Sequence, residues 1–168
     1  VSRALARPIA MFVDQSDDSM IGAAIDAGVS AYVVDGLRKE RVKPVLELVA
    51  KLGADHVNLQ PDVRPYRIED CVPLLEGWRP LADEAGIAVH VETHRDRMTT
   101  DLFFTLHLLD LFPDLRLTAD VSHYLVGREF AWPVDEVNHG LIHRILDNSW
   151  GIHGRIASRE QVQISLGF

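Results

Sequence analysis

The sequence predicts an α/β fold in which parallel strands alternate with helices. Short apolar runs alternate along the chain with segments whose apolar residues recur at helical spacing. Repeated βα units imply right-handed crossovers and a parallel sheet. A complete eight-stranded barrel needs ~250 residues, whereas this chain has 168. We therefore expect an α/β architecture of about six strands and about five helices that is too short to form a complete barrel.

The expected strands are short and apolar, as strands covered by helices on both faces usually are. In chain order they are residues 8–13, 31–34, 56–59, 87–91, 115–119 and 150–156. The second run, AYVV, is β-branched and aromatic and stops at Asp35-Gly36. The last run carries His153, and the tail that follows it is expected to be extended.

The expected helices lie between these strands. In chain order they are residues 20–27, 38–52, 69–85, 99–112 and 135–146. Pro44 lies inside the second span, so we expect a helix start close to it or a local distortion. Thr99 or Thr100 is the expected N-cap of the fourth helix. Apolar residues surround that helix almost completely, which indicates burial on several sides or an oligomer interface.

Composition and charge exclude several functions. The chain has 25 acidic and 17 basic residues and a formal net charge of −8, so neither nucleic acid nor an anionic membrane is an expected partner. No apolar run approaches the ~20 residues that span a bilayer, and we recognise no signal peptide. A single cysteine, Cys71, rules out an internal disulfide and a thiolate zinc site. A cytoplasmic protein is expected.

Four motifs lie at the expected strands of the second part of the chain. They are GADHVNLQ (53–60), HVETHRDR (90–97), LTADVSHY (117–124) and WGIHGR (150–155). As a set, they resemble the xylose isomerase-like TIM barrel superfamily, which contains sugar (phosphate) isomerases and epimerases. The resemblance covers about residues 52–166, and it implies a partial TIM barrel over residues 53–168. It also implies a small-molecule sugar or sugar phosphate as substrate.

Three successive expected strands end in Glu92, Asp120 and His153. The carboxyl ends of barrel strands converge on one mouth, so these side chains can meet there. Two carboxylates and an imidazole suit a divalent ion such as Mn²⁺, Mg²⁺, Co²⁺ or Zn²⁺. Taken alone, Glu92 is equally consistent with a helix cap, and the matching positions of the other two favour a metal ligand.

The resemblance implies further roles. Glu92 would also act as an acid/base, and His123 would contact a ligand water or the substrate, although it is equally consistent with a group that holds Asp120. Arg155 would contact a substrate hydroxyl or phosphate. His94 follows its strand and is a further candidate for substrate binding.

Four loop arginines lie on the same expected face, where they would bind a phosphate or carboxylate or else be solvated. They are Arg64, Arg67, Arg95 and Arg97. The superfamily's fourth ligand is a glutamate on the last barrel strand, and the sequence given stops at Phe168 before such a strand. The resemblance therefore implies a truncated or chimeric isomerase or epimerase with impaired activity.

The first part of the chain carries RPIAMFVDQSDD (7–18) and AGVSAYVVDGL (27–37). These motifs resemble the C-terminal half of a response-regulator receiver domain of the ANTAR type. The resemblance implies a receiver-like βαβα segment over residues 1–52 that lacks the phosphoacceptor strands. The alternative function is therefore a non-catalytic signalling or scaffold protein. Open sheet edges at both ends of an incomplete barrel predict a homo-oligomer.

Overall fold

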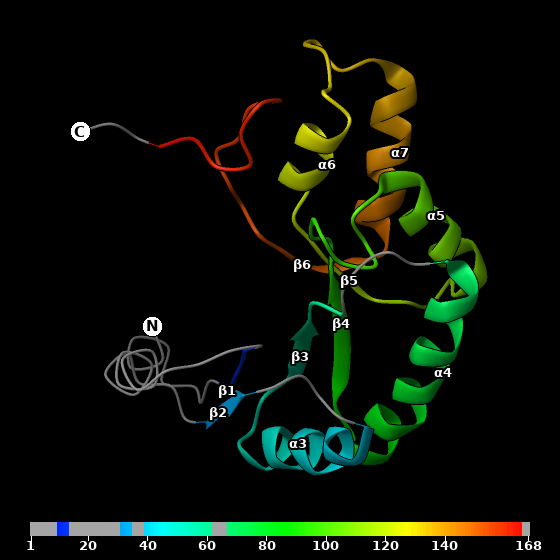
Figure 1. Cartoon of the computed structure of the whole chain (residues 1–168), viewed down its shortest axis with the longest axis vertical. Helices are drawn as coiled ribbons and strands as arrows, with labels where there is room; N and C mark the ends of the chain where they lie inside the picture. Colours follow the sequence, from blue (N-terminus) through cyan, green and yellow to red (C-terminus); the bar gives the residue numbers. More distant parts are fainter. Residues whose placement is uncertain (1–9, 14–30, 35–38, 62–66, 166–168) are drawn as a thin grey trace. The chain divides into compact units, whose positions relative to one another are not determined.

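The computed structural model describes residues 10–13, 31–34, 39–61 and 67–165 (Figure 1). The helix expected at residues 20–27 lies outside the described residues. The described chain is α/β and forms two compact units. The first comprises Val1–Val57 and Glu76–Ala88, and the second comprises Asn58–Leu75 and Val89–Phe168. None of the helices in the described ranges has both the length and the apolar character needed to cross a membrane.

The first unit contains a small parallel sheet. Strands β1 (Ala10–Val13) and β2 (Ala31–Val34) pair in parallel from end to end. Helix α3 (Lys39–Lys51) follows and buries Leu46 and Val49. It continues through Pro44, which therefore does not mark the start of the helix.

A four-stranded, all-parallel sheet carries the candidate site. Its strands are β3 (His56–Leu59), β4 (Ala88–Glu92), β5 (Leu117–Ala119) and β6 (Ser149–Ile152). Their order in the sheet is β3-β4-β5-β6. Because the spatial order follows the chain order, each crossover advances by one strand. The α/β class, the alternation and the parallel sheet are thus confirmed.

Helices connect these strands. They are α4 (Ile68–Ala85), α5 (Leu102–Leu111), α6 (Ser122–Gly127) and α7 (Glu136–Asp147). The N-cap of α5 is Asp101, whose side chain accepts a hydrogen bond from Phe104 N at 2.9 Å, so the expected caps Thr99 and Thr100 are wrong. The Thr99 hydroxyl instead donates to Glu92 O at the end of β4, and Thr100 Oγ1 accepts from Asp96 N in the preceding loop. Helix α6 was not expected from the sequence.

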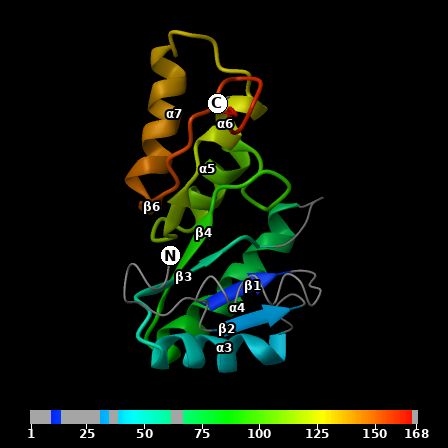
Figure 2. The same ribbon diagram turned by 90° about the vertical axis from the view of Figure 1, so that its left-hand side faces the viewer.

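The core of the second unit lies between the sheet and its helices. Helix α7 packs on β5 and also contacts α5 (Figure 2). Leu108, Leu117 and Ile145 are fully buried there, and each contributes about 1.5–3 kcal/mol through removal of its side chain from water. The Tyr124 hydroxyl donates to Thr105 Oγ1 at 2.9 Å, which connects α6 to α5.

Candidate metal centre

Three neighbouring strand ends supply the candidate ligands. Glu92 is the last residue of β4, Asp120 follows β5, and His153 follows β6. Glu92 pairs with Thr118 across the sheet. Since alternate residues of a strand share a face, Asp120 projects from the same face as Thr118 and Glu92.

A β-bulge determines which residue of β6 joins them. Leu117 pairs with Ser149, but the next residue, Thr118, pairs with Gly151, so Trp150 is the extra residue. The shifted register brings His153 beside Asp120, and the His153 N–H donates to Ala119 O at 2.9 Å. A side chain at position 151 would lie 3.3 Å from Thr118 Oγ1, which suits glycine at this close approach.

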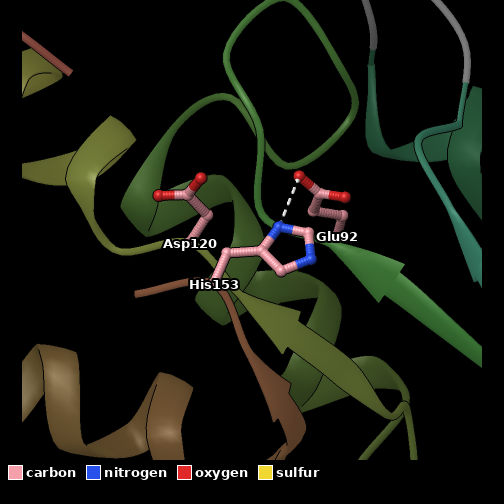
Figure 3. Close-up of side chains that lie close together, drawn as sticks. All are labelled: Glu92, Asp120 and His153. Atoms are coloured by element: carbon pink, nitrogen blue, oxygen red, sulfur yellow. Dashed lines mark hydrogen bonds and ion pairs between the residues drawn. The ribbon is translucent and has the colours of Figure 1, made fainter. Parts of the chain in front are cut away.

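Glu92, Asp120 and His153 converge as the sequence predicted (Figure 3). One ligand atom from each lies within 4.8 Å of the other two. Two atoms bound to one ion at ~2.0–2.6 Å are at most ~5 Å apart, so this cluster can hold a divalent cation. Both carboxylates are buried, whereas 43 % of the His153 side chain is exposed. The cluster is therefore accessible from one side.

Hydrogen bonds fix both carboxylates. Asn58 Nδ2 donates to Glu92 Oε2 at 2.6 Å, and His153 Nδ1 lies 3.2 Å from Glu92 Oε1. The Ser122 hydroxyl donates to Asp120 Oδ1. Arg155 Nε forms an ion pair with Asp120 Oδ2 at 2.6 Å. The two carboxylates and this guanidinium leave one negative charge, and buried charges require pairing or metal coordination.

His123 lies beside Asp120 but does not bind it. Its Nε2 is 3.6 Å from Asp120 Oδ2, which is too long for a hydrogen bond. Burial, and next the charge of His94, lower the pKa of His123 to about 4, although Asp120 opposes the shift. Neither ring nitrogen has a hydrogen-bond partner among the described residues. A buried, neutral imidazole of this kind requires a water or a ligand group.

The remaining predicted site residues differ in how close they lie to this cluster. The His94 ring centroid lies 4.2 Å from that of His123. Arg155, a predicted substrate contact, binds Asp120. Of the loop arginines, Arg67 pairs with Asp70, and Arg64 lies outside the described residues.

Sequence reasoning missed the residues that hold the ligands in place. Asn58 lies in the motif at residues 53–60, and placing β3 next to β4 would have brought it to Glu92. Thr93 Oγ1 accepts a hydrogen bond from Asp120 N at 2.7 Å. The Thr99 hydroxyl donates to Glu92 O at 2.6 Å. Asn58 and Thr93 thus connect the ends of neighbouring strands, and Thr99 connects the end of β4 to the loop that follows it.

No family model matches the sequence, and no curated protein matches it significantly.

Proposed function

We propose that the chain binds a divalent metal ion and catalyses isomerisation or epimerisation of a sugar or a sugar phosphate. The observation that supports this is the cluster of Glu92, Asp120 and His153 at adjacent parallel strand ends. In this proposal the sheet is part of an incomplete, TIM-barrel-like architecture, as the resemblance of the four motifs implies. The ion is Mn²⁺, Mg²⁺, Co²⁺ or Zn²⁺, all of which accept carboxylate and imidazole ligands.

The cluster has the composition of a catalytic metal site. Catalytic sites commonly combine three protein ligands with an open position for water or substrate. Glu92 and Asp120 are held from within the protein, whereas His153 lies at the solvent-accessible side. A substrate oxygen can therefore approach from the side of His153.

The chain's own residues would move the proton. When bound, the ion polarises a carbonyl or hydroxyl oxygen of the substrate. For isomerisation, Glu92 would take the proton from the carbon next to the carbonyl carbon and return it to the former carbonyl carbon, while a proton moves between the two substrate oxygens. For epimerisation, Glu92 would take the proton from one face, and water would supply a proton to the opposite face. His123, neutral and buried, donates one hydrogen bond to a substrate hydroxyl and accepts another. Arg155 offsets the charge of Asp120.

Metal binding is tested by thermal denaturation with and without MnCl₂. A ligand at 100 times its Kd stabilises the folded state by ~2.7 kcal/mol, and we expect Glu92→Gln to remove most of this effect. Glu136→Gln is the matched control, because it removes the same charge from the exposed start of α7. Titration of the folded variants followed by Mn²⁺ electron paramagnetic resonance separates lost binding from lost stability. Equal binding by wild type and Glu92→Gln would contradict the proposed site.

Catalysis is tested separately. Proton NMR in D₂O follows exchange of the hydrogen next to the carbonyl in a panel of aldoses, ketoses and their phosphates. We expect exchange that disappears with EDTA and returns with Mn²⁺. A chain that binds Mn²⁺ but exchanges no hydrogen in any of these sugars would refute the isomerase and epimerase assignment.

A further inference from the structure

An open cavity lies on the loop between β4 and α5. It has a volume of about 460 Å³ and is lined by His94, Arg95, Asp96, Arg97 and Thr100. Sites for small molecules typically have volumes of about 300–1,000 Å³. None of the three candidate metal ligands lines this cavity, so the metal centre leaves its function unassigned.

The lining of the cavity favours an anion. Its charged lining residues are two arginines and one aspartate, Asp96, and a histidine lies beside them. Arg95 is exposed and forms no ion pair with any residue within the described ranges. Arg67, Arg144 and Arg159, by contrast, each pair with a carboxylate. A guanidinium presents donors in a fixed, planar arrangement that matches phosphate oxygens.

The loop is fixed by side-chain hydrogen bonds. Asp96 has a positive φ of 64°, and its N–H donates to Thr100 Oγ1 at 2.9 Å. The His94 N–H donates to Thr99 Oγ1 at 3.1 Å. The Thr99 hydroxyl in turn binds the carbonyl oxygen of Glu92. The loop that carries Arg95 is therefore connected to the strand end that carries a candidate metal ligand.

The cavity and the metal centre are adjacent, because a residue that lines the cavity contacts a residue beside the metal centre. His94 lines the cavity, and its ring lies 4.2 Å from the ring of His123, centroid to centroid. His123 in turn lies next to Asp120, with 3.6 Å between Nε2 and Oδ2. One ligand can therefore contact both places.

We propose that this cavity binds the phosphate group of the substrate through Arg95, with His94 and Arg97 beside it. The inference rests on the proposed function and makes it more specific, because it selects sugar phosphates over free sugars. The substrate would place its phosphate on the loop and its carbonyl or hydroxyl group at the metal centre.

The direct test is binding of inorganic phosphate to the metal-free full chain by isothermal titration calorimetry. Removal of metal prevents phosphate from binding through a cation. We expect the wild type to bind phosphate and Arg95→Ala to bind it at least tenfold more weakly. Arg159→Ala is the matched control, because it removes an exposed arginine that pairs with Glu160 at 2.7 Å. The proposal is overturned by wild type that does not bind, by Arg95→Ala that binds as wild type does, or by an equal loss in both variants.

The same variants separate this inference from the proposed function. We expect Arg95→Ala to keep the Mn²⁺ affinity of the wild type, and Glu92→Gln to keep its phosphate affinity. A chain that binds phosphate through Arg95 but binds no Mn²⁺ supports the cavity and refutes the metal centre. A chain that binds Mn²⁺ through Glu92 but binds no phosphate supports the metal centre and refutes the phosphate site in the cavity.

Competition identifies the chemical group. A hexose 6-phosphate should displace phosphate from the wild type, whereas the free hexose should not. A hexuronate carries a carboxylate in place of the phosphate and should compete at least tenfold more weakly than the hexose 6-phosphate. Equal or stronger competition by the hexuronate or by the free hexose would overturn the phosphate assignment.

Discussion

Replacement of Asn58 by alanine tests how the metal centre depends on its supporting residues. The substitution removes the hydrogen bond from Asn58 Nδ2 to Glu92 Oε2, which is 2.6 Å long. The Glu92 side chain is only 3 % exposed, so water has little access to replace the lost donor. Hydrogen bonds to charged groups contribute about 1.5–3 kcal/mol. We expect the metal-free variant to lose free energy of unfolding by about this amount.

Metal affinity should fall as well. Loss of a group that orients a metal ligand weakens binding by about 10–100-fold, which corresponds to about 1.4–2.7 kcal/mol. We expect the Kd for Mn²⁺ to rise by this factor, as measured by titration with electron paramagnetic resonance detection. Urea denaturation of the same metal-free samples gives the free energy of unfolding.

Asn138→Ala provides the matched control. Asn138 Nδ2 also donates to a carboxylate, Asp135 Oδ2, at 2.7 Å, but it does so at the start of α7. The control should leave the Mn²⁺ affinity unchanged. Folded Asn58→Ala that binds Mn²⁺ as tightly as wild type would refute the reasoning, and so would an equal loss of affinity in the control.

Four further outcomes are expected. Burial holds the pKa of His123 at about 4, below its ordinary value of 6.5. As the pH falls from 6.5 to 4, the unfolded chain therefore takes up a proton at His123 before the folded chain does, and the metal-free protein should lose ~3 kcal/mol of stability. Urea denaturation should show no such loss in His123→Gln. Tyr124→Phe removes two buried hydrogen bonds and should cost about 1–2 kcal/mol in the same assay. Asp101→Ala removes the N-cap of α5 and should cost about 1 kcal/mol, with faster hydrogen exchange in the first turn. We propose that the exposed Ile152 of strand β6, at one end of the sheet, supports self-association, so Ile152→Lys should lower the mass measured by light scattering, and an unchanged mass would contradict this.

The fold was predictable because its signals are local. A short run of β-branched and aromatic residues, as in AYVV, favours a strand, and the described strands and helices other than α6 lie close to the expected ranges. Boundaries were less predictable where suitable residues adjoin one another. Thr99, Thr100 and Asp101 can all cap a helix. In the structure Asp101 is the cap, and the hydroxyls of both threonines bind backbone groups of residues that precede them.

The candidate site was predictable in part. Glu92, Asp120 and His153 were found because each follows an apolar run, and parallel strands bring such positions together. The contact of Asn58 with Glu92 joins positions 34 residues apart and depends on which strands are neighbours. No local pattern carries that information.

The bulge at Trp150 shifts the pairing register of β6 against β5 by one residue. Three residue steps lead from Leu117 to Asp120, but four lead from its partner Ser149 to His153. With equal counts, Ile152 would lie opposite Asp120, and the imidazole would turn toward the other face of the sheet. Regular pairing of Trp150 with Thr118, without the bulge, would thus exchange a nitrogen donor for an aliphatic group and leave every other ligand in place. The pairing register of one strand therefore decides whether an imidazole reaches the two carboxylates.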